Sequence, residues 1–295
     1  MKILVTGASG FIGRYCCTQL SALGYEVHAV SSKSQSDETV HWHKADLLDS
    51  QQSIRLIRNI QPTHLLHLAW CAEPGKYWTS IENYHWVKAS LTLFEEFLES
   101  GGKRVVVAGS CAEYDWCFDN YSEDTTPLAP ATLYGTCKHS LQMMLSAYAS
   151  LTGLSVAWGR VFSIYGPGEH PNRLFASVIR SLLQGQEVHI NNGGLIRDYL
   201  HVNDVASAFV ALINSDVKGP INIGSGSGTP LKDLAGKIEK KIGIFGCLKL
   251  NSNPISKADA EAIVADTQLI KSIGWQPIYN LDTGLEDTIN WFKLN

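Results

Sequence analysis

One pair of side chains in this sequence is suited to proton transfer: the phenol of Tyr134 and the ammonium group of Lys138. Because they are four residues apart, both side chains project from the same face of a helix. A nearby cationic lysine favours the phenolate, so the pKa of the tyrosine moves toward the range useful for proton transfer to a carbonyl or from a hydroxyl. The same spacing is common on exposed helices, which is the alternative interpretation of the pair.

Ser110 gives this pair a third partner. It follows the apolar run 104–108, which predicts a strand, and therefore lies at the carboxyl end of that strand. Ligands bind at the carboxyl ends of strands in open α/β sheets. The Ser110 hydroxyl could hydrogen-bond the reacting oxygen there, so the three residues together predict a catalytic site.

The first thirteen residues predict a phosphate-binding turn. Residues 2–6 form a short β-branched run, typical of a strand buried on both faces, and glycines follow at positions 7, 10 and 13. Such glycines allow a tight turn and a close approach to a pyrophosphate, while the next helix offers free N–H groups and the positive end of its dipole. We predict dinucleotide binding here, with an accidental turn as the alternative. The expected contacts are Gly7, Ser9, Gly10, Phe11, Ile12 and Gly13.

Strands and helices alternate along the chain. Strands are predicted over 26–31, 64–68, 104–108, 154–158 and 220–223, and helices over 50–59, 81–99, 134–150 and 206–214. This alternation is typical of an α/β fold with a Rossmann-type doubly wound parallel sheet. After Tyr165 the rhythm changes: a loop at 166–168 precedes a helix near 174–183, and another helix starts at 230 or 231.

The change of rhythm predicts two parts. We expect a dinucleotide-binding Rossmann domain over 1–165 plus about 195–223, and a smaller α/β substrate-binding lobe over 166–194 and 224–295. The cleft between the two is the natural place for a ligand.

Composition argues against several other functions. The net charge of −4 gives no footprint for nucleic acid, and no apolar stretch is long enough for a membrane span. The start of the chain lacks the pattern of a signal peptide, so we expect a cytoplasmic location. Seven cysteines without C-x-x-C spacing indicate reduced thiols and no metal. Metal binding by His41, His43, His64 and His67 is the alternative to the structural role that we assign to them.

The order of these motifs resembles that of the extended short-chain dehydrogenases/reductases, in the branch of NAD(P)-dependent nucleotide-sugar epimerases, dehydratases and 4-ketoreductases. The resemblance covers nearly the whole chain. Besides the glycine turn and the triad of Ser110, Tyr134 and Lys138, it rests on residues 46–47, 67–69, 160–167, 197–205, 222–224 and 274–277.

The resemblance implies a role for each matching residue. Tyr134 would be the general acid or base at a sugar oxygen, Lys138 would lower its pKa and hold the nicotinamide ribose, and Ser110 would orient the oxygen. Hydride would pass between the nicotinamide and a sugar carbon, most often C4. The cofactor contacts implied beyond the glycine turn are Ser31, Ser32, Lys33, Asp46, Leu47, Leu68, Ala69, Trp70, Tyr134, Lys138 and Val161. The substrate contacts implied are Ser110, Cys111, Ser163, Arg173 and Arg197, with the two arginines on the diphosphate. An ordinary surface position is the alternative for Arg173.

Two departures from the family pattern bear on the reaction. Cys111 and Ala112 stand where dehydratases carry Asp-Glu, or at least Glu, so dehydration is disfavoured. We interpret Glu113, one residue further on, as a loop carboxylate. Trp70 and Trp86 replace a small residue and an asparagine, which reshapes the pocket near the nicotinamide, and Ser163 replaces another asparagine.

A third departure bears on the cofactor. Ser31 stands where NAD-specific members carry the Asp that binds the ribose 2′-hydroxyl. The segment Ser31-Ser32-Lys33 offers hydroxyls and a positive charge, which suit a 2′-phosphate, so NADP is favoured over NAD.

Three hypotheses follow. The first is NADPH-dependent reduction of a nucleotide-linked 4-keto-6-deoxyhexose, and the second is an NAD-dependent nucleotide-sugar C4-epimerase. The third is a non-catalytic dinucleotide sensor, which the presence of both Tyr134 and Lys138 disfavours. The expected partner is a nucleotide-diphosphate sugar, without nucleic acid or membrane. The resemblance also implies a homodimer through helices near 86–100 and 134–150.

Overall fold

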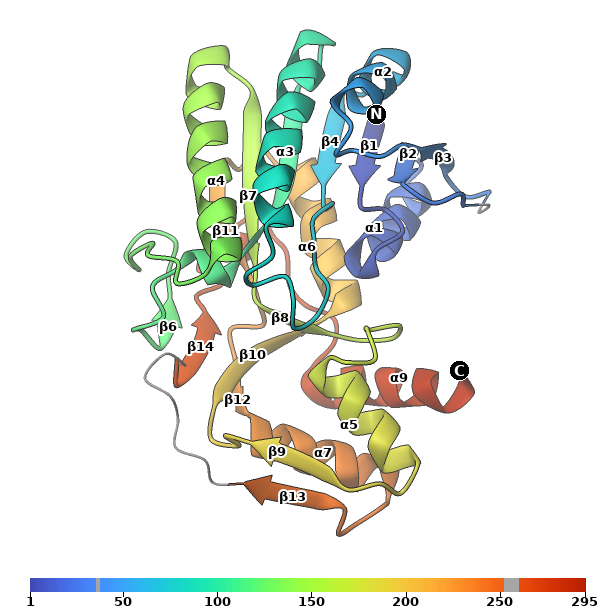
Figure 1. The fold of residues 1–295 in the computed structure, drawn as a ribbon, viewed down its shortest axis with the longest axis vertical. Coiled ribbons are helices and arrows are strands. Elements are labelled where there is room, and N and C mark those ends of the chain that lie inside the picture. Colours follow the sequence, from blue (N-terminus) through green and yellow to red (C-terminus); the bar gives the residue numbers. More distant parts are fainter. Residues whose placement is uncertain (36–37, 252–259) are drawn as a thin grey trace.

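A parallel sheet of seven strands forms the larger part of the molecule (Figure 1). The computed structural model describes residues 1–35, 38–251 and 260–295. In spatial order the strands are β11 (Gly219–Ile223), β7 (Ser155–Val161), β5 (Arg104–Ser110), β4 (His64–His67), β1 (Lys2–Thr6), β2 (Glu26–Ser31) and β3 (His41–Lys44). The order reverses between β1 and β4, as in the doubly wound Rossmann fold, so the predicted fold class is confirmed. The central strands β1 and β5 are almost entirely buried, which explains their continuous apolar sequences.

Helices cover both faces of this sheet. One face carries α1 (Phe11–Ala22) and α6 (Val202–Asn214), with α8 (Gln268–Ser272) beside β11; the other carries α2 (Ser50–Ile60), α3 (Glu82–Glu99) and α4 (Leu133–Thr152). Side-chain caps define where two of these helices begin. Asp49 accepts hydrogen bonds from N–H groups in the first turn of α2, and Thr132 accepts one from the N–H of Gly135 in α4. At the other end of α4, Gly153 has φ 77°, a conformation that suits glycine.

A smaller region lies beyond the carboxyl ends of the large sheet (Figure 1). Its main sheet has the order β12 (Gly228–Pro230), β10 (Ile196–His201), β14 (Ala262–Ala265) and β6 (Asn120–Tyr121), and β8 (Ser163–Tyr165) also pairs with β10. A two-stranded sheet joins β13 (Leu248–Asn251) to β9 (Val188–Asn191), and the helices are α5 (Leu174–Leu183), α7 (Leu231–Ile242) and α9 (Leu281–Leu294). These helices share an apolar core separate from the cores on the two faces of the large sheet.

The segment 195–223 is divided between the two regions. Strand β10 belongs to the smaller sheet, whereas α6 and β11 pack with the large one. The histidines considered as metal ligands lie in β3 and β4. Across residues 1–35, 38–251 and 260–295, no group of three or more His, Cys, Asp or Glu side chains is arranged to hold a metal ion. Within those same ranges no helix is long and apolar enough to cross a membrane.

Candidate active site

The turn between β1 and α1 has the geometry that a phosphate site needs. Gly7 has φ 66°, and a Cβ atom there would lie 2.8 Å from the backbone N of Ala69. A Cβ atom on Gly13 would lie 2.1 Å from the carbonyl oxygen of Gly7, so only glycine allows the helix to pack this closely. Gly10 directly precedes α1 and has no side chain that could accept a hydrogen bond from it. The first N–H groups of a helix have no partner within the helix. These N–H groups can therefore bind an anion.

A cavity of about 1360 Å³ extends from this turn across the carboxyl ends of the strands to α5. It brings together residues from both regions of the molecule. The predicted site residues that line it are Gly7, Ser9, Gly10, Phe11, Ile12, Gly13, Ser31, Ser32, Asp46, Leu47, Leu68, Ala69, Trp70, Ser110, Cys111, Tyr134, Lys138, Val161, Ser163, Arg173 and Arg197. Lys33 is not part of the lining; it is exposed just after β2, and its backbone N–H donates to the Ser31 hydroxyl at 3.1 Å.

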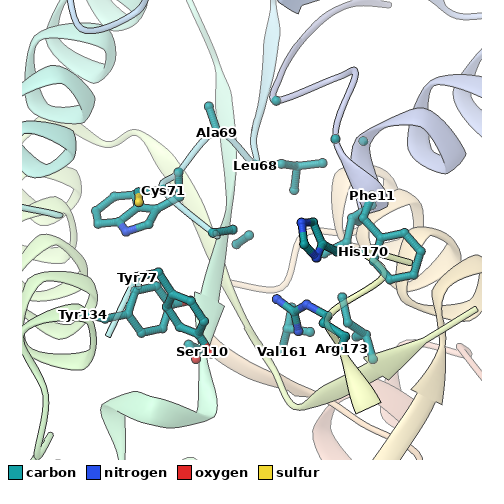
Figure 2. Close-up of a pocket in the computed structure, with 18 of the residues that line it drawn as sticks. Phe11, Leu68, Ala69, Cys71, Tyr77, Ser110, Tyr134, Val161, His170 and Arg173 are labelled. Atoms are coloured by element: carbon teal, nitrogen blue, oxygen red, sulfur yellow. The ribbon is translucent and has the colours of Figure 1, made fainter. Parts of the chain in front are cut away.

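Tyr134 and Ser110 lie together on one side of the cavity (Figure 2). Burial raises the pKa of Tyr134, and a hydrogen bond with Ser110 partly opposes that shift. The direction is opposite to the one predicted from the Tyr134–Lys138 pair. The reason is that desolvation of the phenolate is the largest effect on this half-buried side chain. Tyr134 is therefore a neutral phenol that can donate a proton.

Lys138 is buried below the same part of the cavity, with 3% of its surface exposed. Its Nζ donates to the carbonyl oxygen of Ala108 at 2.8 Å and lies 3.7 Å from the centre of the Trp70 ring. Burial lowers the pKa of Lys138 to about 7, and the negative charge of Glu113 acts in the opposite direction. A lysine with such a pKa changes charge near neutral pH.

Glu113 is fully buried beneath Ser110. Its carboxylate accepts hydrogen bonds from the backbone N–H of Ser110 at 2.8 Å and from Trp158 at 2.9 Å, and it forms an ion pair with Arg160 at 2.9 Å. It does not line the cavity. Glu113 belongs to the short turn Cys111–Glu113 directly after β5, and Arg160 from β7 supplies the charge that allows its burial.

Several residues that line the cavity were not predicted. Tyr77 and Trp78 come from the segment after β4, and their rings lie 4.9 and 5.7 Å from the ring of Tyr134. Trp116 packs against Trp78 at 5.8 Å. These aromatic residues have no periodic pattern in the sequence, because they belong to connections between elements.

Further basic side chains line the cavity. Arg14 of α1 and His170, which precedes α5, line the cavity in addition to the predicted arginines. Arg14 donates to the carbonyl oxygen of Pro167 at 2.6 Å, so the loop before α5 is joined to the glycine turn. Figure 2 shows His170 and Arg173 on the same side of the cavity as Phe11, away from Tyr134. Arg14 could have been predicted as a site residue, because it directly follows Gly13 of the predicted phosphate-binding turn.

Comparison with known proteins agrees with this geometry. The model of the NAD dependent epimerase/dehydratase family matches residues 3–224, and the chain belongs to this family. The UDP-glucose 4-epimerase of Rhizobium meliloti (strain 1021) is 27% identical over 318 residues, covering 98% of this chain and 96% of that protein.

Solved structures extend the similarity over the whole chain. The UDP-glucose 4-epimerase of Thermotoga maritima, solved with UDP-glucose, is similar with a TM-score of 0.88 and 26% identity, covering 100% of this chain and 99% of that one. MoeE5, solved in complex with UDP-glucuronic acid and NAD, is similar with a TM-score of 0.87 and 30% identity, with the same coverage. The predicted resemblance to the nucleotide-sugar epimerases and dehydratases is therefore confirmed.

Proposed function

We propose that this chain is an NADPH-dependent reductase of a nucleotide-linked 4-keto-6-deoxyhexose. The observation that carries the proposal is that Tyr134, Ser110 and the glycine turn all line one cavity. Its volume of about 1360 Å³ exceeds the roughly 300–1,000 Å³ of a single small-ligand site, which suits a dinucleotide and a nucleotide sugar together. The dinucleotide would supply hydride, while Tyr134 donates a proton to the carbonyl oxygen and Ser110 orients that oxygen.

Tyr134 can supply the proton that a reduction needs. A carbonyl that accepts hydride becomes an alkoxide and needs a proton, and a phenol with a raised pKa holds that proton at neutral pH. Burial also raises the pKa of the Cys111 thiol to about 12, so this neighbour is neutral as well. Elimination of water is disfavoured, because Cys111 and Ala112 carry no carboxylate and Glu113 is engaged with Arg160.

The aromatic residues beside Tyr134 support a deoxy sugar as the substrate. Tyr77, Trp78 and Trp116 present rings beside Tyr134, and rings pack against the C–H groups of a sugar better than against a carboxylate. Arg173 and Arg197 line the same cavity, where they would bind the diphosphate. Arg197 also donates to the carbonyl oxygens of Ile196 and Ala260, which orients its guanidinium group.

A C4-epimerase that retains NAD is the second candidate, and the similarity to UDP-glucose 4-epimerases favours it. Epimerisation needs room for the keto sugar to rotate, and Trp70 and Trp86, which both line the cavity, reduce that room. A non-catalytic sensor would have no need for the buried Tyr134–Ser110 pair.

A screen of sugar nucleotides with NADPH and NADH separates these functions. Reduction predicts loss of absorbance at 340 nm and a product heavier by two hydrogens. An isomeric product without net loss of reduced dinucleotide, together with NAD that stays bound through purification, would establish epimerisation instead. Turnover of none of the 4-keto sugars would refute the reductase.

We also propose that the protein is a cytoplasmic homodimer whose subunits meet through α3 and α4. These neighbouring helices expose apolar side chains: Tyr84 is 63% exposed and Met143 is 58% exposed. A dimer formed through these helices would cover such exposed apolar side chains. Light scattering should give twice the chain mass of 32.4 kDa, and Met143→Glu should reduce it to the monomer; a monomeric wild-type protein would refute the proposal.

A further inference from the structure

The indole ring of Trp70 faces the ammonium group of Lys138. The distance of 3.7 Å from Nζ to the ring centre is within the range of a cation–π interaction. The same ammonium group donates to the carbonyl oxygen of Ala108. An ammonium group has three N–H donors, so with one on the carbonyl and one on the ring, a third remains for a ligand in the cavity that both residues line.

The position of the indole ring is fixed from its other side. Its Nε1–H donates to Oδ1 of Asn83 at 2.8 Å, and the ring stacks on Trp86 with 6.2 Å between centres. Asn83 is itself completely buried, and its amide donates to the carbonyl oxygens of Tyr77 and Ser80. Trp70 therefore cannot turn away from the lysine without breaking a buried hydrogen-bond network.

We propose that Trp70 is a positioning residue that holds the ammonium group of Lys138 charged and directed at the cavity. Lys138 is 97% buried and has little water to stabilise its charge, and the negative face of an indole ring supplies part of that stabilisation. The pairing itself does not depend on the proposed function; only its use in catalysis rests on it.

Two titratable groups act on Lys138 besides the ring. Glu113 favours its charged form, but this carboxylate is already paired with Arg160. His67 is buried, and the positive charge of Lys138 contributes to holding its pKa at about 3, so it stays neutral. Burial lowers the pKa of Lys138, and loss of the indole face would remove one group that opposes this shift.

Carbon-13 NMR of lysine-labelled protein tests the pairing directly. The Cε resonance of Lys138, assigned by its loss in Lys138→Arg, reports the titration midpoint of this lysine. We expect Trp70→Leu to lower the midpoint by about one pH unit, and Trp70→Phe to lower it less, because phenylalanine binds cations more weakly than tryptophan. Trp116→Leu is the matched control, since Trp116 lines the same cavity and packs on Trp78. An unchanged or raised midpoint in Trp70→Leu, or an equal fall in the control, would overturn the proposal.

Two further comparisons complete the test. If Trp70→Leu does not fold, the wild type and Trp70→Phe alone decide: identical midpoints contradict the proposal. With a sugar nucleotide that is turned over, the pH above which kcat falls should move down in the order wild type, Trp70→Phe, Trp70→Leu. Failure to find any such substrate would refute the proposed function, whereas the NMR midpoints would still decide the pairing.

Discussion

The backbone N–H of Ser110 donates a 2.8 Å hydrogen bond to Oε1 of Glu113, a carboxylate without solvent exposure. The Ser110 hydroxyl in return accepts from the N–H of Ala112, which closes a capping box at the end of β5. The ion pair between Glu113 and Arg160 thus anchors the backbone of Ser110. The position of Ser110, which lines the cavity, therefore depends on a charge pair that does not line it.

Neutralising this anchor should destabilise the fold. Glu113→Gln leaves the buried guanidinium of Arg160 without a counter-charge, and breaking a buried pair costs roughly 3–5 kcal/mol. Urea unfolding followed by circular dichroism measures the loss. The control is Asp282→Asn, which breaks an exposed pair with Lys237 and should cost less than about 1 kcal/mol. A Glu113→Gln variant as stable as this control would show that the pair does not stabilise the fold.

Cofactor choice should depend on the charge at Lys33. Ser31 and Ser32 line the cavity and Lys33 is exposed beside them, so an aspartate there would repel a 2′-phosphate but not a 2′-hydroxyl. We expect Lys33→Asp to weaken NADPH binding by about tenfold or more, with a much smaller effect on NADH. Fluorescence titration gives both dissociation constants. Lys103→Asp, at the amino end of β5, should change neither, and equal losses for both cofactors in Lys33→Asp would place the 2′-phosphate elsewhere.

His67 belongs to a chain of hydrogen bonds that fixes its tautomer. Thr6 Oγ1 accepts from the N–H groups of Leu68 and Ala69, and it lies 2.8 Å from Nδ1 of His67, to which it must donate. The proton of the ring is then on Nε2, 2.9 Å from the Ser90 hydroxyl. Burial lowers the pKa of His67 to about 3, and Lys138 adds to this shift. The histidine is structural, in agreement with its predicted role.

This shift should make the protein sensitive to acid. Below pH 6.5 the unfolded chain binds a proton at His67 that the folded chain does not bind, so stability falls as the pH decreases toward 3. The titration of His67 alone lowers the free energy of unfolding by about 2 kcal/mol between pH 7 and pH 5. His67→Gln should remove that part of the pH dependence in urea titrations, whereas His189→Gln, at an exposed position, should retain it. Parallel curves for wild type and His67→Gln would contradict the assignment.

The fold could be predicted because its signals are local. The buried run of β1 and the glycines after it specify a strand, a turn and a helix within thirteen residues. The beginning of α6 was harder to predict from the sequence. The helix starts at Val202, four residues before the predicted start. Polar side chains obscure it, since His201 caps the helix and Asp204 accepts hydrogen bonds from the N–H groups of Ile278 and Tyr279.

The burial and the charge partners of the site residues were harder to predict than the residues themselves. The raised pKa of Tyr134 arises from burial, and burial depends on Tyr77 and Trp78 folding over it from a connection without periodicity. Glu113 meets Arg160 across 47 positions of sequence, a pairing that only the neighbouring positions of β5 and β7 bring about.

We propose that Tyr134 donates a proton to the alkoxide that forms when a carbonyl group accepts hydride from the dinucleotide. Single-turnover reaction of the enzyme with NADPH deuterated at C4 on the transferred face, and with the 4-keto sugar nucleotide that the screen identifies, tests it most directly. We predict one deuterium on the sugar carbon that bore the carbonyl, and a rate lower by about 10² or more in Tyr134→Phe with unchanged NADPH binding. Deuterium that stays in the dinucleotide, or an undiminished rate in Tyr134→Phe, would contradict the account.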